Sequence, residues 1–593
     1  MAAAPKIIVV GGGLAGLSAV IKIAEMGGNV DLFSIVPVKR SHSVCAQGGI
    51  NAAKNLKGEG DSTWKHFDDT VYGGDFLANQ PPVKDMCEAA PGIIDLLDRM
   101  GVPFNRTPEG LLDFRRFGGT LYNRTAFAGA TTGQQLLYAL DEQVRRYESE
   151  GKVKKYEHWE FLSAVLDGNR VCRGICAMDL RSMEVRTFPA DALIIATGGN
   201  GAIFGKSTNS VVCTGSAQSA LYQQGAFYAN GEFIQVHPTC IPGEDKLRLM
   251  SESARGEGGR VWVPKTASDK RDPKSIPQGE RWYFLEEWYP KYGNLVPRDI
   301  ATRAIFKVVF ELNLGIDGKP MVYLDLTHID RKILDRKLEG ILEIYEKFVG
   351  DDPRDTPMKI FPGMHYTMGG IWVDFNQMTN VPGIFAAGEC EYQYHGANRL
   401  GANSLVSCIF GGFIAGPNAI AYAKSLPAIE GDGGAAAEVA RQAEINSKLI
   451  NNEGGENPFK LWRELGETMT EHATVIRYNK DLKEADEKIV ELLERFKNVN
   501  LSDKSQWANT SFAFARQLKN MLELSRTITL GAILRDESRG AHYKPDFPDR
   551  NDERFLKTTK ASFTGDVEGP KFEYEDVDTQ FIKPRPRRYD AAK

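Results

Sequence analysis

The sequence has few cysteines, and none of them has the spacing that holds a metal ion or an iron–sulfur cluster. Its eight cysteines are scattered over 593 residues, and no two of them form a CxxC pair. Clustered cysteines are the usual ligands of structural zinc and of iron–sulfur clusters, so we expect no metal site in this chain. Isolated cysteines are instead typical of reduced cytosolic thiols.

The chain also lacks an excess of positive charge. It has 73 Lys and Arg against 78 Asp and Glu, which gives a formal net charge of −5. Nucleic-acid-binding domains usually carry a basic face, so nucleic acid is not an expected partner. Hydrophobic residues make up 42% of the chain and charged residues 25%, as in ordinary globular proteins. A chain of this length is too long for one core and predicts two to four domains.

Little in the sequence is typical of a membrane span. One apolar stretch, residues 404–423, runs for twenty positions without a charge and is long enough to cross a bilayer. Glycines and Pro417 interrupt it, and we interpret it as a buried helix that packs against a cofactor. The first predicted strand begins near residue 7, which leaves no room for a signal peptide. We therefore expect a soluble or peripheral protein.

A glycine fingerprint near the N-terminus predicts dinucleotide binding. The apolar residues 7–10 are followed by Gly11-Gly12-Gly13-Leu14-Ala15-Gly16 and by a helical pattern that continues to Met26. The glycines permit a tight turn, close approach of a pyrophosphate and close packing of the helix on the strand. The helix N-terminus presents unpaired N–H groups to the phosphates. The predicted contacts are Gly11, Gly13, Leu14, Ala15 and Gly16.

The rest of the chain divides by composition and periodicity into an α/β fold with additions. Strand-like and helix-like segments alternate up to about residue 240, a more polar region follows, and nucleotide-type motifs resume near residue 381. We predict a Rossmann-like nucleotide-binding domain (1–242 and 359–430), an inserted α+β capping domain (243–358), a helical domain (431–545) and a C-terminal arm (546–593). In the helical domain Leu482, Ala485, Ile489, Leu492, Leu493 and Phe496 form one apolar helix face. We expect the basic tail, residues 583–588, to be a solvated arm rather than a docking element.

Several segments resemble the flavoprotein subunits of succinate dehydrogenase and fumarate reductase. Residues 40–50 (RSHSVCAQGGI) match the segment in which that family carries its flavin. Residues 232–239, 251–259, 296–299, 364–370 and 395–405 match the family in the same order, and residues 537–549 resemble the segment after its helical domain. The residues around Ser41 and Ser216 most resemble those of the branch with a single cytochrome b membrane subunit, in which the electron acceptor is often menaquinone.

The resemblance implies that FAD is bound covalently through its 8α-carbon to His42. It further implies FAD contacts from Ser34, Ser41, Ser43, Gln47, Gly48, Gly49, Ser216, Glu389, Ser404 and Leu405. The ribose contact stays open, because spacing alone favours Asp31 whereas the resemblance favours Ser34. Ser216 stands where many relatives have an aspartate.

The resemblance also implies a dicarboxylate site and a proton relay. Arg399 and His365 would hold one carboxylate, His237 and Ser251 the other, and Phe117 would pack on the carbon chain. Ser251 replaces the threonine that is common in relatives. Arg298 would exchange a proton with the substrate and pass it along Glu252 and Arg255.

Since the chain has no iron–sulfur motif, the resemblance implies an iron–sulfur partner subunit. Through that subunit it implies a cytochrome b membrane subunit on the cytoplasmic face of the cell membrane. The expected enzyme is a succinate:quinone oxidoreductase. Two alternatives are a soluble aspartate-type oxidase, which His42 disfavours, and a non-catalytic flavoprotein, which Arg298 and Arg399 disfavour.

Overall fold

A parallel five-stranded sheet forms the centre of the first part of the molecule, which we call the parallel-sheet region. The computed structural model describes residues 4–244, 246–426 and 433–589. The strand order is β19-β10-β1-β2-β6, with every pair parallel. The bounds are β1 (Lys6–Val10), β2 (Asn29–Ser34), β6 (Val153–Glu157), β10 (Ala192–Ile195) and β19 (Ile384–Ala386). The central strands are almost wholly apolar because both faces of the sheet are covered, one by helices and the other largely by an antiparallel meander, residues 159–189. This confirms the predicted α/β class.

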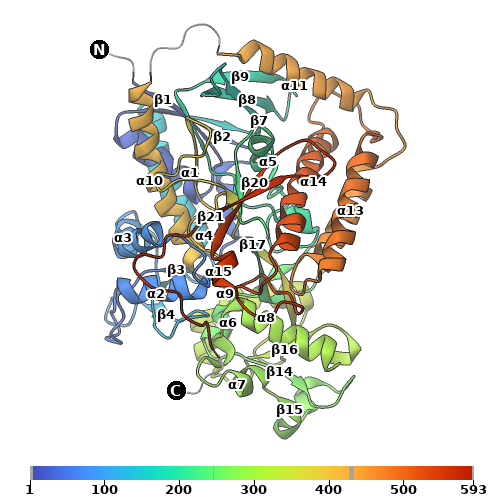
Figure 1. The fold of residues 1–593 in the computed structure, drawn as a ribbon. Coiled ribbons are helices and arrows are strands. Elements are labelled where there is room, and N and C mark those ends of the chain that lie inside the picture. The colour runs from blue at the N-terminus through green and yellow to red at the C-terminus, as the bar shows by residue number, and fades with distance from the viewer. Residues whose placement is uncertain (1–3, 245, 427–432, 590–593) are drawn as a thin grey trace.

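Two long helices pack together on this sheet. The first, α1 (Leu14–Glu25), lies against α10 (Asn403–Ser425), as Figure 1 shows. A Cβ atom at Gly412 would lie 2.3 Å from the backbone oxygen of Ala15, so glycine lets the two helices approach. By length and composition α10 is the one helix in the described residues that could cross a membrane, and 61% of its most apolar window is buried. Helix α10 is therefore packed inside the protein, as predicted for residues 404–423.

Further helices and an antiparallel meander belong to the parallel-sheet region. Helices α2 (Thr63–Gly73), α3 (Gln80–Arg99) and α4 (Thr132–Ser149) lie between β2 and β6 in the chain. An antiparallel meander of β7 (Trp159–Leu166), β8 (Cys172–Asp179) and β9 (Val185–Pro189) separates β6 from β10. Helix α5 (Ser216–Gln223) follows β10.

A second, antiparallel sheet of six strands forms the lower part of the molecule in Figure 1. Its order is β13 (Arg248–Leu249), β12 (Ile234–Ile241), β17 (Met358–Thr367), β16 (Val322–Asp325), β14 (Arg260–Pro264) and β15 (Arg281–Trp282). Helices α6 (Ser253–Gly256), α7 (Phe284–Trp288), α8 (Arg298–Phe306) and α9 (Arg331–Val349) accompany it, with an apolar core of their own. Strands β12 and β17 lead into and out of this region and carry two of the predicted histidines.

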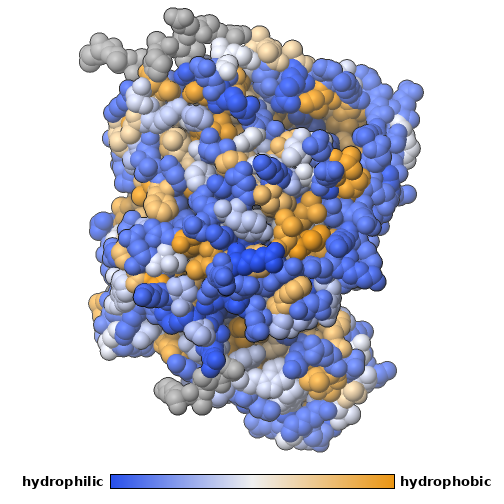
Figure 2. Space-filling view, viewed as in Figure 1, coloured by the Kyte–Doolittle hydropathy of each residue, from blue (hydrophilic) through white to orange (hydrophobic). Residues whose placement is uncertain are grey.

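The helical region contains α11 (Ala435–Ile450), α12 (Pro458–His472), α13 (Asn479–Phe496) and α14 (Thr510–Leu534). The predicted apolar face of α13 is confirmed: Leu482, Ala485, Ile489 and Leu492 are buried, and Leu493 and Phe496 pack against the same core. The predicted boundary at residues 430 and 431 lies outside the described residues. The surface seen in Figure 2 is mostly hydrophilic, with hydrophobic residues in scattered groups.

The expectation that the basic tail, residues 583–588, is a solvated arm is wrong for Arg585 and Arg587, which form ion pairs with Asp68 and Asp299. After α15 (Asp552–Phe555) the chain forms a hairpin of β20 (Lys557–Ser562) and β21 (Lys571–Asp576), and β20 pairs with β11 (Tyr228–Ala229). The basic tail then runs back over the molecule, and the side chain of Arg587 is only 6% exposed where it meets Asp299. Charge pattern alone could not reveal this contact, because the partner carboxylate lies 288 residues earlier.

Candidate active site

One cavity of about 540 Å³ joins the nucleotide-binding turn to the sheet of the capping region. Its walls come from the carboxyl ends of the parallel strands, where ligands bind in folds of this kind. All predicted site residues line it except Gly16 and Arg255. No group of three or more His, Cys, Asp or Glu side chains in the described part of the chain could hold a metal ion.

In the part of the chain that the structure describes, three helices begin at the wall of this cavity without a hydrogen bond to their N-cap side chain. These are α1 after Gly13, α5 after Gly215 and α10 after Ala402. The first N–H groups of a helix have no partner within it and carry a partial positive charge, so such helix ends suit phosphates and other anionic groups.

The glycine fingerprint is shaped by close approach. A Cβ at Gly11 would lie 2.1 Å from the oxygen of Ala196, and one at Gly16 would lie 1.9 Å from the oxygen of Gly11. Gly11 also has a φ of +116°, which disfavours other residues. Gly16 therefore fixes the packing of α1 on β1 and lies behind the cavity wall, whereas Gly11 and Gly13 line the cavity.

The two candidates for the ribose contact lie in different places. Ser34, at the end of β2, lines the cavity. Asp31 lies further back along the strand, where Lys6 forms an ion pair with it at 2.9 Å. On the other wall, Ser216 is the first residue of α5 and its hydroxyl accepts a hydrogen bond from Asn520 at 2.7 Å.

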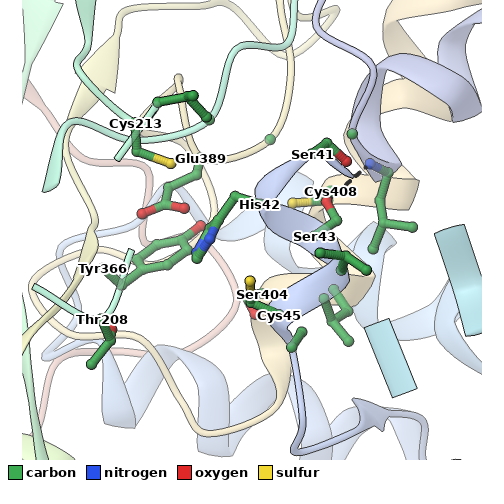
Figure 3. Close-up of a pocket in the computed structure, with 18 of the residues that line it drawn as sticks. Ser41, His42, Ser43, Cys45, Thr208, Cys213, Tyr366, Glu389, Ser404 and Cys408 are labelled. Carbon is green, nitrogen blue, oxygen red and sulfur yellow. Dashed lines mark hydrogen bonds between the residues drawn. The ribbon is translucent and has the colours of Figure 1, made fainter. Parts of the chain in front are cut away.

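His42 lies in a short 3₁₀ turn, and its imidazole is fixed from the opposite wall. The backbone N–H of Ser210 donates to Nδ1 at 3.1 Å, and the Asn209 amide nitrogen lies 3.2 Å from Nε2. Burial, with Lys246 as the second cause, lowers the pKa of His42 to about 4, so the ring is neutral near pH 7. Figure 3 shows Ser41 and Ser43 on one side of the ring, and Tyr366 and Thr208 on the other.

Glu389 faces the same part of the cavity. Its carboxylate accepts a hydrogen bond from the backbone N–H of Thr367 at 3.1 Å. Burial raises its pKa to about 7, although the contact with Thr367 and the charge of Arg399 act in the opposite direction. Ser404 and Leu405, in the first turn of α10, complete this wall.

At the far end of the cavity lie a histidine and an arginine with hydrogen-bonding capacity to spare. The N–H of Thr239 lies 3.2 Å from Nδ1 of His237, and we assign the ring proton to Nε2, a buried atom with no partner among the described residues. Nε of Arg399 is also buried without a partner. Buried donors without partners are costly, so this end of the cavity suits an anion.

His365 and Ser251 extend this group of donors. Thr208 lies 2.7 Å from Nδ1 of His365 and fixes the orientation of its ring. Burial, and then the neighbouring positive charges, lower the pKa of both histidines well below the ordinary value, so both are neutral. The hydroxyl of Ser251 accepts a hydrogen bond from the N–H of Ser253 at 3.2 Å.

Arg298 is held on two sides. Its Nε and Nη2 donate to Oε2 of Glu252 at 2.9 and 2.7 Å, and its Nη1 donates to Gln235 at 2.9 Å. A guanidinium has five N–H bonds, so one N–H on each Nη nitrogen is left for a ligand. Arg255 lies 3.2 Å from Oε1 of Glu252 and is not one of the residues that line the cavity.

Phe117 closes the cavity above these groups. A Cβ at Gly48 would lie 2.8 Å from Cε1 and Cζ of Phe117, so the glycine makes room for the edge of this ring. The next residue, Gly118, donates its N–H to Oε1 of Glu252 at 2.9 Å. The same loop therefore supplies an apolar cover and a contact to the carboxylate.

Sequence reasoning missed the residues that hold the others in place. Thr208, Asn209 and Ser210 orient His365 and His42, and no motif marked them. Gln235 could have been found, because residues two apart in a strand share a face and His237 was already predicted. The ring of Tyr366 lies 4.3 Å from the guanidinium carbon of Arg399, a cation–π contact.

Comparison with known proteins gives matches over the whole chain. The family model described as FAD binding domain matches residues 6–405, and that described as fumarate reductase flavoprotein C-term matches residues 462–589. The chain is 65% identical over 591 residues to the succinate dehydrogenase flavoprotein subunit of Bacillus subtilis, with 99% of each chain covered. It is 35% identical to the fumarate reductase flavoprotein subunit of Escherichia coli, over 98% of this chain and 95% of that protein.

Solved structures agree with the sequence matches. The FrdA chain of E. coli quinol fumarate reductase superposes with a TM-score of 0.89 at 33% identity and 100% coverage of both chains. Sdh1 of Mycobacterium smegmatis in complex with UQ1 gives 0.82 at 28% identity, covering 99% of this chain and 96% of that one. These matches favour the dehydrogenase and reductase hypothesis over the amino-acid oxidase alternative.

Proposed function

Because the chain belongs to the family of succinate dehydrogenase and fumarate reductase flavoproteins, and so is an FAD-binding oxidoreductase, we propose that its cavity interconverts succinate and fumarate. The observation that supports the proposal is that the nucleotide-binding turn and the predicted substrate-binding residues line one continuous cavity. The same 540 Å³ space is lined by the nucleotide-binding turn and by His237, His365, Arg298 and Arg399. A dicarboxylate in this space would lie next to the flavin.

The residues present fit FAD. The uncapped N-termini of α1 and α5 suit the pyrophosphate, Ser34 suits the ribose, and the N-terminus of α10 suits the flavin ring. We assign the covalent link to the imidazole of His42, whose ring nitrogens face the Ser210 N–H and the Asn209 amide. When bound, FAD supplies the acceptor or donor for a hydride equivalent. Every other step falls to side chains of this chain.

Substrate binding rests on the spare donors. Nε2–H of His237 and the Ser251 hydroxyl would hold one carboxylate of the substrate, and Arg399 and His365 the other. Charge-assisted hydrogen bonds of this kind are about twice as strong as neutral ones. Phe117, which is 1% exposed, would cover the carbon chain and exclude water.

Proton transfer is assigned to the buried row of Arg298, Glu252 and Arg255. In fumarate reduction an Nη–H of Arg298 would protonate the substrate carbon and leave a neutral guanidine. The ionised Glu252, which already accepts from Nε and Nη2 of Arg298, would take a proton from Arg255 and pass it to that guanidine. Burial lowers the pKa of Arg255, which eases its loss of a proton, and Arg255 would regain one from solvent. Succinate oxidation runs along the same atoms in reverse.

The proposed partners are an iron–sulfur subunit and, through it, a cytochrome b membrane subunit on the cytoplasmic face of the cell membrane. Two observations support this. No cysteine spacing in the chain suits an iron–sulfur cluster, so electrons need another protein to leave the flavin. One structural relative, which covers 98% of this chain at a TM-score of 0.88, is described as a quinol–fumarate reductase with menaquinol molecules.

An acceptor assay on the purified holoprotein tests the function. We expect succinate to reduce a phenazine-type dye, and a reduced viologen to drive fumarate reduction, with little consumption of oxygen. Arg298→Ala should abolish both activities while covalent flavin and dicarboxylate binding persist. Rapid oxygen-dependent turnover of L-aspartate, without dye reduction by succinate, would contradict the proposal.

A further inference from the structure

The last described residues of the chain form a strap across two regions of the molecule. In Figure 1 the dark red chain runs from β21 past α2 towards α6 and α7. Gln80, at the start of α3 and fully buried, accepts hydrogen bonds from the N–H groups of Phe581 and Ile582 and donates to the Ile582 oxygen at 2.7 Å. We call residues 583–589 the C-terminal strap.

The first half of the strap lies on the nucleotide-binding region. Arg585 donates to both oxygens of Asp68 on α2 at 2.8 Å. The hydroxyl of Tyr72, also on α2, accepts from the N–H of Arg588 at 2.6 Å and donates to the oxygen of that residue at 3.0 Å. These contacts fix the backbone on either side of Arg587.

The second half reaches the capping region. Arg587 donates from Nη1 and Nη2 to Oδ2 and Oδ1 of Asp299 on α8, at 2.5 and 3.0 Å. Tyr589 is buried, with its ring between those of Tyr72 and Tyr292 at centroid distances of 5.4 and 5.1 Å. The strap therefore links α2 of the parallel-sheet region to α8 of the capping region and to the loop before α8.

Asp299 is the point at which the strap meets the active site. It follows Arg298 directly on α8, and its Oδ1 also accepts a hydrogen bond from Asn398 at 3.1 Å. Asn398 in turn precedes Arg399 and accepts from Gln235, the residue that holds Nη1 of Arg298. One buried carboxylate thus joins the segments that carry both arginines.

Arg587 is the closest positive charge to this carboxylate. The side chain of Asp299 is 2% exposed, and its nearest other cation, Arg303, lies at the 4.0 Å limit of an ion pair. A buried carboxylate without a close partner is strongly unfavourable, so loss of Arg587 would make Asp299 turn towards Arg303 or admit water. Either change moves the start of α8.

We propose that Arg587 is a positioning residue for catalysis, acting through Asp299 to hold Arg298 in register with Arg399. This inference rests on the proposed function, which assigns the proton-transfer role to Arg298. A displacement of about 1 Å at a catalytic group can reduce turnover by up to two orders of magnitude, so a contact at the very end of the chain can control the rate.

The test compares Arg587→Met with Arg588→Met in the holoprotein within its native complex. Arg588 is a matched control, because it is the next residue of the strap, carries the same charge and has an exposed side chain. For each variant we would measure covalent flavin, kcat and KM for fumarate reduction, the solvent isotope effect on kcat, and the dissociation constant of malonate, a dicarboxylate that does not react.

Arg587→Met should lower kcat about tenfold or more and raise the solvent isotope effect, with malonate affinity changed less than threefold. Arg588→Met should match the wild type. If Arg587→Met loses its flavin, Arg587→Lys takes its place, because lysine keeps the charge but not the bidentate contact with Asp299. Measured against Arg588→Lys as its control, Arg587→Lys should show a fall in kcat and a rise in the solvent isotope effect that are smaller than those expected of Arg587→Met.

Wild-type kcat and isotope effect in the Arg587 variants, or equal losses in the Arg588 controls, would overturn the proposal. Failure of the wild-type protein to reduce fumarate or oxidise succinate would instead overturn the proposed function.

Discussion

Glu252 contacts two arginines through different oxygens: its Oε2 lies 2.7 Å from Nη2 of Arg298, and its Oε1 lies 3.2 Å from Nη2 of Arg255. All three side chains are buried. Burial tends to raise the pKa of Glu252, but the two guanidinium groups outweigh burial and lower the pKa below its usual range. The carboxylate is therefore ionised and ready to accept a proton from either side.

The first prediction is that Glu252→Gln lowers kcat for fumarate reduction by at least about 100-fold, because an amide cannot relay a proton. Glu257→Gln is the matched control, since Glu257 lies at the end of the same short helix but pairs with Lys337 outside the cavity. Steady-state kinetics of the two variants decide the matter. Equal activity of Glu252→Gln and the wild type would exclude this path for the proton.

The second prediction concerns binding. His237→Ala should raise KM for succinate by about 10- to 100-fold, because a hydrogen bond to a charged group contributes about 1.5–3 kcal/mol. The orphaned Nε2 of His237 is the observation behind it. His328→Ala, at an exposed position of the capping region, serves as the control. An unchanged KM together with unchanged malonate affinity would remove His237 from the binding site.

Much of the fold could be predicted from the sequence because its signals are local. The glycine fingerprint, the apolar strands and the periodic face of α13 each need only a few neighbouring residues. The role of Gly16 also follows from the fingerprint, although only the structure shows that it packs against the oxygen of Gly11 rather than facing the cavity.

The remaining features depend on contacts between distant segments. Ser210 meets His42 across 168 residues, and Thr208 meets His365 across 157. Nothing in the local pattern of residues 207–210 marks them as partners of histidines. The contact of Arg587 cannot be predicted from the sequence for the same reason, since its counter-charge, Asp299, belongs to another part of the chain.

The third prediction tests the packing of α10 on α1. Gly412→Ala should destabilise the protein by about 1–3 kcal/mol, because the added Cβ would lie 2.3 Å from the oxygen of Ala15. Gly92→Ala should instead raise the free energy of unfolding by about 0.5–1 kcal/mol, since that exposed helical glycine has no described atom within 4 Å of an added Cβ. Thermal unfolding of the two variants provides the measurement. A stabilising Gly412→Ala would show that the two helices are not in contact.

The fourth prediction is a pH dependence of stability. Burial raises the pKa of Glu391 to about 8 from an ordinary value of 4.5. Between these values the folded protein keeps a proton that the unfolded chain has released, so stability falls as pH rises through this range. Glu391→Gln has no proton to lose and can still accept the hydrogen bond from the N–H of Gln393.

The variant should therefore match the wild type near pH 5 and exceed its thermal midpoint by a margin that grows up to about pH 8. The exposed Glu494→Gln should show no such trend. Thermal midpoints measured at several pH values provide the comparison. A constant difference across the range would contradict the raised pKa.

The most direct test of the central claim is the site of flavin attachment. The holoprotein would be denatured in acid, separated on a gel, examined for flavin fluorescence in the protein band, and then digested and analysed by peptide mass. We predict flavin on the peptide that contains His42, and a non-fluorescent band with flavin released for His42→Ser. Flavin released from the wild-type protein, or attached to any other residue, would contradict the assignment of this cavity as a covalent flavin site.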